Sequence, residues 1–209
     1  MKRLEDIRLY GILDMGYVGP ANIVRTASEM IDGGVDILQL RAKRFIPDDV
    51  RWMAEQIHQV TSAAGVPFVI NDFPEVAAEV GAEGVHIGQD DISVNQARSV
   101  AGYRTIVGKS THSVVQAVSA AAEDTDYLGF GPLFATATKP AYKPIGLEDI
   151  HAIHKAIKKP IFCIGGIKLE NLAAVLDAGA RRVVIVSAIL QAPDIAAYCR
   201  KVKALLAGN

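Results

Sequence analysis

Cysteine and aromatic residues are scarce in this sequence, and neither sign of charge predominates. The chain of 209 residues has two cysteines and 6% aromatic residues. Cys163 lies inside the apolar run Pro160–Ile164, and Cys199 lies in a helical segment. Cysteines placed in this way are typical core residues of a reduced cytoplasmic protein, and nothing in their positions calls for a disulfide.

The balance of charge excludes several kinds of partner. Lysine and arginine number 22 against 23 acidic residues, a formal net charge of −1. This offers no basic surface for nucleic acid or for an anionic membrane, so an anionic ligand must be held by a few local groups. No run approaches the ~18–20 apolar residues of a membrane span, and acidic residues stand near the N-terminus where a signal peptide would be apolar. We therefore expect a soluble, cytoplasmic protein, with its oligomeric state left open.

Several familiar catalytic motifs are also missing. The sequence has no Ser-His-Asp spacing, no Cys-x-x-Cys pair, no Walker loop and no histidine-rich cluster. His86, inside an apolar run, is expected to be a hydrogen-bonded structural residue. Lys109 and His112 are placed near the predicted mouth with their roles open.

What the sequence does contain is an alternation of short apolar runs with helical segments. Half of the residues are hydrophobic, and Ala, Val, Ile and Leu supply most of them, as in parallel sheets covered by helices. The predicted strands are Leu9–Leu13, Asp36–Leu40, Pro67–Asn71, Gly84–Ile87, Thr105–Lys109, Asp126–Phe130, Pro160–Ile164 and Arg182–Val186. The predicted helices are Ala21–Asp32, Asp48–Ala64, Pro74–Val80, Val94–Val100, Val114–Glu123, Leu147–Ile157, Leu169–Ala178 and Asp194–Leu206.

Eight such units in ~200 residues predict an α/β fold, a single-domain (β/α)8 TIM barrel over residues 1–209. No linker or shift in composition marks a second domain. An open, doubly wound sheet is the alternative, since periodicity alone does not show closure. Polar residues follow many different strands, which favours a ring of loops at one mouth of a barrel.

Three cations and two carboxylates follow these strands. Arg41 and Lys43 stand two apart and so point the same way, and Lys139 adds a third cation from a threonine-rich loop. Charges pointing into a barrel mouth are costly unless they meet anions, although a solvated surface pair is the alternative. Asp72 and Asp91 would repel each other unless a cation lies between them, as Mg²⁺ does when carboxylates and substrate phosphate hold it. The alternative for Asp91 is a helix cap.

The last two strands end in residues suited to a phosphate group. Gly165-Gly166 and Ser187–Ile189 occupy the usual phosphate site of a barrel, where backbone N–H groups and a short helix N-terminus face the anion. A simple tight turn is the alternative for the two glycines. Together the pattern suggests a diphosphate with Mg²⁺ on one side and a monophosphate on the other, which points to group transfer.

As a set, these motifs resemble the thiamine-phosphate synthase family. They are Gln39–Lys43, Asn71-Asp72, His86–Asp91, Ser110–His112, Gly131–Lys139 and Gly165-Gly166, and they occur in order over nearly the whole chain. The resemblance implies a Mg²⁺-dependent transferase that joins a hydroxymethylpyrimidine diphosphate to a thiazole phosphate. The products are thiamine phosphate and diphosphate. The implied route is dissociative: diphosphate leaves first, and the thiazole nitrogen captures the pyrimidine-methyl cation.

The resemblance also implies roles for individual residues. The pyrimidine diphosphate would be held by Gln39, Leu40, Arg41, Ala42, Lys43, Asn71 and Ser110. The thiazole phosphate would be held by Thr136, Ala137, Thr138, Gly166, Val186 and Ser187, with Lys139 bridging towards the diphosphate. Asp72 and Asp91 would bind Mg²⁺, and the expected catalytic residues are Arg41, Lys43, Ser110 and Lys139. The first strand has Leu13 where the family tends to have Thr before the Asp, which weakens any role for Asp14.

Two other functions fit parts of the pattern. A thiazole tautomerase of the same barrel family would use Ser110–His112 as a source of a general base. It needs no diphosphate clamp, so the retention of the cations and both aspartates argues against it. A non-catalytic barrel that binds thiamine precursors would gain little from a metal site aimed at a leaving group.

Overall fold

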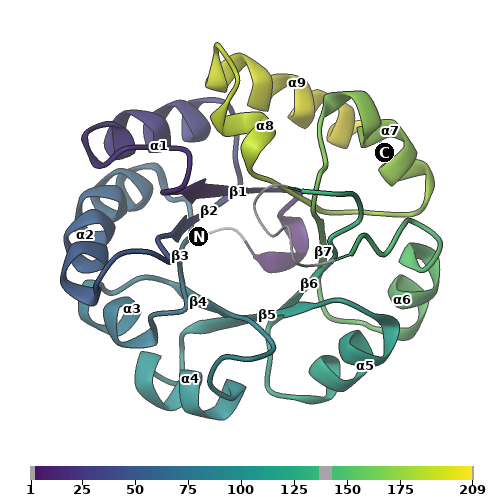
Figure 1. Cartoon of the computed structure of the whole chain (residues 1–209), viewed down its shortest axis with the longest axis horizontal. Helices are drawn as coiled ribbons and strands as arrows, with labels where there is room; N and C mark the ends of the chain where they lie inside the picture. Colours follow the sequence, from purple (N-terminus) through teal and green to yellow (C-terminus); the bar gives the residue numbers. More distant parts are fainter. Residues whose placement is uncertain (1–2, 137–142, 209) are drawn as a thin grey trace.

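The first strand of the chain pairs with the second and with the last, which closes the sheet into a barrel of eight parallel strands. The computed structural model describes residues 3–136 and 143–208. Within them each strand pairs with the next along the chain, and helices form an outer ring (Figure 1). The strands are β1 Leu9–Asp14, β2 Ile37–Arg41, β3 Phe68–Asn71, β4 Gly84–Ile87, β5 Ile106–Thr111, β6 Tyr127–Phe130, β7 Ile161–Ile164 and β8 Val183–Ile185. The predicted barrel is confirmed, and the open doubly wound alternative is wrong.

Closure depends on a short parallel pairing at the seam. Leu9 pairs with Val183, Tyr10 with Val184 and Gly11 with Ile185. Side chains on a strand alternate between two faces, so this register decides which residues enter the barrel. Gly11 faces outward, where an added Cβ would lie 2.5 Å from the end of the Met30 side chain.

The helices begin and end at residues whose chemistry suits those positions. They are α1 Ile23–Asp32, α2 Pro47–Ala64, α3 Pro74–Val80, α4 Val94–Ala101, α5 Val114–Ala122, α6 Ile150–Ala156, α7 Leu169–Asp177, α8 Ser187–Leu190 and α9 Ile195–Ala207. Proline occupies the first position of α2 and α3, where its missing N–H costs nothing. Ser93 caps α4 with a reciprocal pair of bonds to Gln96. Gly65 ends α2 in the left-handed conformation.

Two hydrophobic cores result from the alternation of side chains. The larger one lies between strands and helices, and it includes both cysteines, which are free and buried. Burial raises the pKa of each thiol to about 12, so neither is a reactive thiolate at neutral pH. The smaller core fills the barrel and consists of Ile7, Tyr10, Ile12, Ile37, Val69, Tyr127, Phe162 and Val184.

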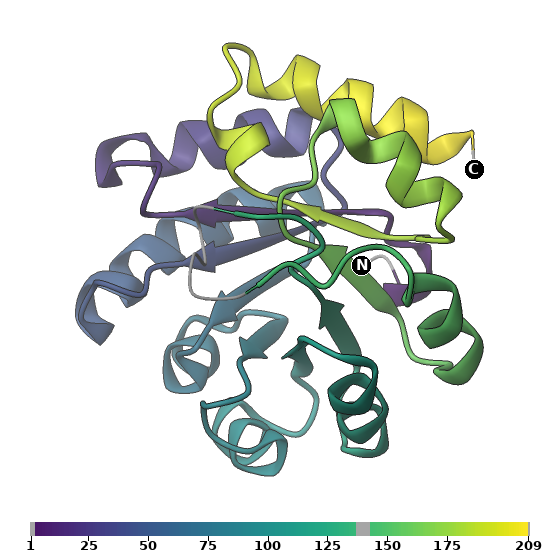
Figure 2. The same ribbon diagram turned by 45° about the vertical axis from the view of Figure 1, so that its right-hand side comes forward.

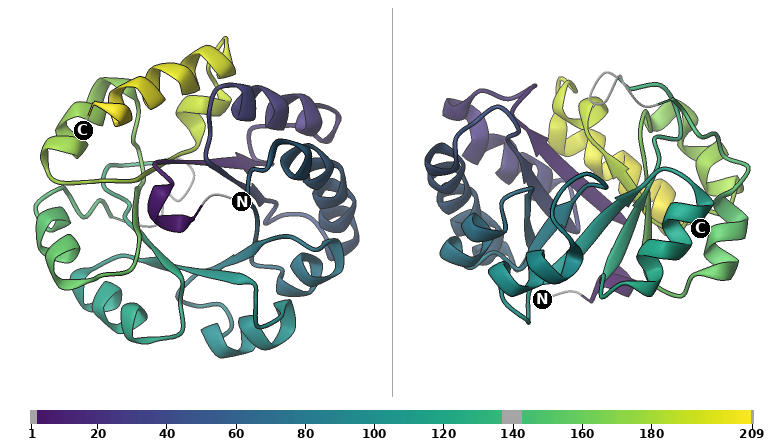
Figure 3. Two further views of the ribbon diagram at one scale, coloured as in Figure 1. Left: turned by 180° about the vertical axis from the view of Figure 1, so that it is seen from behind. Right: turned by 60° about the horizontal axis from the view of Figure 1, so that its bottom comes forward.

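The N-terminal end of the barrel is covered by the short helix η1 Leu4–Asp6. Seen from behind, η1 crosses the centre of the ring (Figure 3), and Ile7 next to it is fully buried in the inner core. At the seam, α9 packs beside α1 (Figure 2). These contacts leave the opposite end of the barrel as its open mouth. No helix among the described residues is long and apolar enough to cross a membrane.

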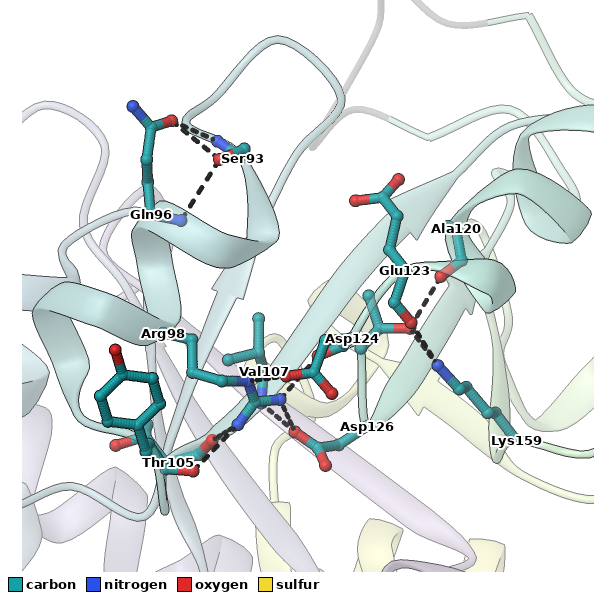
Figure 4. Close-up of polar contacts among 12 residues, drawn as sticks. Ser93, Gln96, Arg98, Thr105, Val107, Ala120, Glu123, Asp124, Asp126 and Lys159 are labelled. Carbon is teal, nitrogen blue, oxygen red and sulfur yellow. Dashed lines mark hydrogen bonds and ion pairs between the residues drawn. The ribbon is translucent and has the colours of Figure 1, made fainter.

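Arg98 of α4 ties the outer ring to the starts of β5 and β6 (Figure 4). Its Nη1 donates to the Thr105 carbonyl at 2.8 Å, and its Nη2 donates to Asp126 Oδ2 at 2.8 Å. The same Asp126 oxygen accepts the Val107 N–H at 2.7 Å. Arg98 Nε pairs with Asp124 at 2.7 Å, and the arginine side chain is 11% exposed. One side chain therefore satisfies several backbone and carboxylate oxygens.

We predict that Arg98→Met lowers the free energy of unfolding by about 2 kcal/mol. The substitution keeps much of the aliphatic length and leaves the carbonyl and carboxylate acceptors without their donor. Urea unfolding followed by circular dichroism measures the change. Arg104→Met is the control, since Arg104 is exposed, and it should change stability by less than about 0.5 kcal/mol. Equal losses in the two variants would contradict this account of Arg98.

Candidate functional site

The mouth of the barrel contains a hollow to which every one of the eight strands contributes a lining residue. Its polar lining comes from strand ends far apart in the chain, as the barrel geometry requires. The lining residues with polar side chains are Gln39, Arg41, Asn71, His86, Ser110, Thr111, His112, Thr136 and Ser187. Apolar walls from Ile12, Ile164, Ile167, Val184 and Val186 complete it. Residues predicted for the pyrimidine diphosphate and residues predicted for the thiazole phosphate thus line one hollow.

Arg41 is held at the end of β2 by a carboxylate of the neighbouring strand. Its Nη1 lies 2.5 Å from Asp14 Oδ2, with side-chain exposures of 14% and 5%. Asp14 also accepts the Gly16 N–H at 2.8 Å. The register pairs Asp14 with Arg41 directly. The sequence left Asp14 without a role, and the structure gives it one, because it orients the guanidinium at the hollow.

Lys43 and Asp72 form a second, more open ion pair beside the first. Lys43 Nζ lies 3.0 Å from Asp72 Oδ2, with exposures of 45% and 18%. Arg41 and Lys43 line one adjoining hollow between the loops that follow β1 and β2, so the strand spacing places both on one side. Asp72 has a φ of 68°, a conformation that Asp tolerates better than most residues. Its backbone N–H donates to the His86 carbonyl at 2.9 Å.

Asp91 approaches Asp72 closely enough to affect its ionisation. Burial is the main cause that raises the pKa of Asp72, and repulsion from Asp91 adds to it, while Lys43 lowers it. Asp91 Oδ2 also accepts the Gly88 N–H at 2.6 Å, and the helix-cap alternative for Asp91 is wrong, because Ser93 caps α4. No group of three His, Cys, Asp or Glu side chains suited to a metal occurs among the described residues. Two carboxylates fit Mg²⁺ when substrate phosphate and water supply the other oxygens.

Asn71 presents an unsatisfied donor to the hollow. Its side chain is buried, with 7% exposure, and its Nδ2 has no hydrogen-bond partner in the described part of the chain. Buried amide groups are nearly always paired, so this one calls for a ligand atom. Ser110 is also at the wall, where its Oγ lies 2.9 Å from His86 Nε2. His86 was expected to be structural, and it does make two bonds, but it also lines the hollow.

The two glycines after β7 let a neighbouring loop dock against them. Gly165 and Gly166 have φ values of 100° and 67°, and a Cβ on Gly165 would lie 2.4 Å from Pro132 Cα. Leu133 N–H donates to the Ile164 carbonyl at 2.9 Å, and Phe134 N–H donates to the Gly165 carbonyl at 3.0 Å. The loop after β6 is thereby laid along β7, which brings Thr136 to the hollow beside Gly166.

The end of β8 supplies the start of a short helix at the same wall. Helix α8 begins at Ser187, directly after Val186, and both residues line the hollow. The first N–H groups of a helix have no partner inside it, so they are available to an anion. Gly166, Val186 and Ser187 therefore line one hollow together, and the phosphate role that the sequence predicts for them stays a prediction.

The remaining residues that the sequence singles out differ in where they lie. The side chains of Leu40 and Ala42 are buried in the larger core between strands and helices. Only their backbone atoms could therefore contact a ligand. Lys109 faces outward, where its Nζ pairs with Glu123 at 2.8 Å. His112 lines the hollow, and its Nδ1 lies 2.5 Å from the Gly131 carbonyl oxygen. Ala137, Thr138 and Lys139 lie outside the described residues.

Comparisons with known proteins agree with this geometry. Residues 9–189 match the family model described as thiamine monophosphate synthase. The thiamine-phosphate synthase of Chloroflexus aurantiacus is 39% identical over 97% of this chain and 94% of its own length. That of Thermus thermophilus is 41% identical over 92% of this chain and 93% of its own. Among solved structures, thiamine phosphate pyrophosphorylase from Pyrococcus furiosus superposes with a TM-score of 0.90 at 28% identity, covering 98% of each chain.

We predict that Gly165→Ala destabilises the protein by about 3 kcal/mol or more, because a strained φ is combined with a backbone collision. Gly65→Ala is the matched control: its φ is 65°, but nothing lies within 4 Å of the added Cβ. It should lose only about 1 kcal/mol. Thermal unfolding of the two variants measures the difference. Similar losses would show that the loop after β6 does not depend on the absence of a side chain at Gly165.

Proposed function

The chain belongs to the thiamine monophosphate synthase family, and on that premise we propose how its mouth joins a pyrimidine diphosphate to a thiazole phosphate. One observation carries the proposal. Arg41 lines the same hollow as Gly165, Gly166 and Ser187, and Lys43 lines the adjoining hollow with Arg41 and pairs with Asp72. Two anionic substrates bound there would meet at its centre.

The diphosphate side stabilises a leaving group. Arg41 and Lys43 would bind the diphosphate oxygens, and Lys139 is proposed as a third cation. Arg41 pairs with Asp14 and Lys43 with Asp72, so the diphosphate would compete for two cations that are already oriented. Charge placed where negative charge develops lowers the barrier for breaking the methylene C–O bond. The electron pair of that bond leaves with the diphosphate.

Asp72 and Asp91 are the proposed Mg²⁺ ligands. A magnesium ion bound by them would neutralise charge on the departing diphosphate. The chain's own part is to hold the two carboxylates close together, with Lys43 at 3.0 Å from one of them. The bond from Asp91 to the Gly88 N–H fixes the second carboxylate.

The pyrimidine would lie between Gln39, Asn71 and Ser110. The Asn71 donor and the Ser110 hydroxyl lie in the same lining as apolar side chains such as Ile12 and Val184, and such a mixture suits a flat heterocycle with ring nitrogens. We propose that backbone atoms of Leu40 and Ala42 also contact the pyrimidine. No side chain is required to attack the substrate, because the second substrate supplies the nucleophile.

The thiazole phosphate would bind at the opposite wall. Gly166, Val186 and Ser187 would hold its phosphate through backbone N–H groups, and Thr136, Ala137 and Thr138 are proposed to contact it as well. A thiazole bound there would have its nitrogen available to the methylene carbon that the diphosphate leaves. Holding both reactants in one orientation removes most of the entropic cost of their encounter.

The tautomerase alternative is less consistent with the charged groups. His112 does line the hollow, yet its Nδ1 is engaged with the Gly131 carbonyl oxygen. The paired charges of Arg41, Lys43 and the two aspartates have no task in a proton transfer. Incubation of the purified protein with both substrates and Mg²⁺ tests the choice. Thiamine phosphate detected by mass spectrometry supports the synthase. Its absence at high protein concentration, with metal-free conversion of the thiazole isomer, would support the tautomerase.

We predict that Asp91→Asn lowers kcat/KM about a hundredfold, because the variant loses a metal-binding charge. An amide oxygen can still accept the Gly88 N–H, so the fold around the site is retained. Binding of the thiazole phosphate, measured by calorimetry, should be unchanged.

The matched control is Asp90→Asn, which removes the same charge from the neighbouring exposed residue. It should retain activity within about twofold, as expected for a surface substitution. Normal turnover by Asp91→Asn at the same Mg²⁺ concentration would show that Asp91 is not a metal ligand.

A further inference from the structure

A line of hydrogen bonds crosses the barrel interior beneath the mouth. Gln39 Nε2 donates to the Tyr10 hydroxyl at 2.8 Å, and the Tyr10 and Tyr127 hydroxyls lie 2.9 Å apart. The Tyr127 hydroxyl lies 3.0 Å from His86 Nδ1, and His86 Nε2 lies 2.9 Å from Ser110 Oγ. Two residues of the hollow, Gln39 and Ser110, are thereby linked through the inner core.

The two tyrosines in this line are tightly enclosed. Tyr10 and Tyr127 are 2% and 1% exposed, and each meets the Phe162 ring edge-on, at centroid distances of 5.4 and 5.3 Å. A Cβ at Gly108 would lie 2.0 Å from Tyr127 Cζ, so the ring has room only because that residue is glycine. Burial raises the pKa of both phenols. Each therefore stays protonated and has one proton to donate.

The amide at one end decides the direction of the line. An amide nitrogen only donates, so the Tyr10 oxygen is an acceptor from Gln39. If Tyr127 also donated to Tyr10, the Tyr10 proton would have no acceptor among the contacts of the described residues. A buried donor without an acceptor is costly. Tyr10 must then donate to Tyr127, and Tyr127 must donate to His86 Nδ1.

We propose that this one-way line holds His86 with its proton on Nε2 and so makes Ser110 a hydrogen-bond donor to the substrate. The His86 Nε2–H occupies a lone pair of Ser110 Oγ, and the serine proton remains for a ligand. Tyr10, Tyr127 and His86 are positioning residues that act through Ser110. The identity of the ligand, a pyrimidine diphosphate with hydrogen-bond acceptor atoms, rests on the proposed function. Ser110 therefore favours a substrate atom that accepts a hydrogen bond and disfavours a substrate atom that donates one.

Nuclear magnetic resonance of the protein labelled with ¹⁵N-histidine tests the direction without any reaction. The chain has five histidines, and the His86 signal is the one lost in His86→Asn. We expect two-bond ¹H–¹⁵N correlations to show a protonated Nε2 and a bare Nδ1. A bare Nε2 with a protonated Nδ1, or a ring protonated on both nitrogens, would overturn the proposal.

Tyr127→Phe tests the coupling to Ser110. It keeps the ring and removes one hydroxyl, so the bare-Nδ1 pattern of His86 should be lost. The KM for the pyrimidine diphosphate should rise about tenfold, with the KM for the thiazole phosphate unchanged. Tyr103→Phe is the matched control, since Tyr103 is 83% exposed, and it should alter neither quantity.

A double-mutant cycle separates positioning from simple destabilisation. In a Ser110→Ala background, Tyr127→Phe should have almost no further effect on that KM, because its route to the ligand is gone. Additive effects would overturn the proposal. The proposed hydrogen-bond direction and the proposed reaction can be refuted independently. An active synthase with the opposite His86 tautomer refutes only the one-way line, and an inactive protein with the expected tautomer refutes only the proposed reaction.

Discussion

Parallel pairing between β1 and β8 turns a sheet of short strands into a ring, and everything at the mouth follows from that ring. Once the strands are parallel and the sheet is closed, the carboxyl end of every strand opens onto one space. Residues as distant in the chain as Arg41, Ser110 and Gly165 then line the same hollow. An open sheet would spread these residues along an edge, and they would not line one hollow.

A closed ring of eight strands has an interior that must be filled, and here the filling is not purely apolar. Ile7 and Phe162 contribute apolar side chains to the inner core. In the same core, the paired hydroxyls of Tyr10 and Tyr127 introduce polarity. Tyrosine suits this position because its ring fills volume while its hydroxyl extends a hydrogen-bonded line. The inner core therefore supports the mouth chemically as well as mechanically.

The charges at the mouth are arranged in opposed pairs. Arg41 faces Asp14, and Lys43 faces Asp72. Such pairing lets cations stand at a partly buried position before any anion arrives, because an unpaired charge there would be strongly disfavoured. It also accounts for a nearly neutral chain that is nevertheless suited to anionic ligands: the positive charge is local, and it is balanced locally.

The local sequence pattern was sufficient to predict most of the secondary structure and the fold class. Short apolar runs alternating with amphipathic segments specify strands and helices through short-range packing, so β4 and α3 have the predicted bounds. The small differences lie at ends. β5 continues two residues beyond the prediction, to Thr111, because Ser110 and Thr111 still pair with β6. The polar residues after the strands were also visible as a set, since their spacing follows the repeat.

What the chain alone determined, then, is which residues stand at strand ends and which kinds of ligand their charges and glycines suit. Only the tertiary structure decided how they meet. Barrel closure, the pairing of Asp14 with Arg41 and the outward turn of Lys109 towards Glu123 depend on register between strands remote in sequence. The tyrosine line was invisible beforehand, because a tyrosine in an apolar run is indistinguishable from ordinary core until the opposite strand supplies its partner.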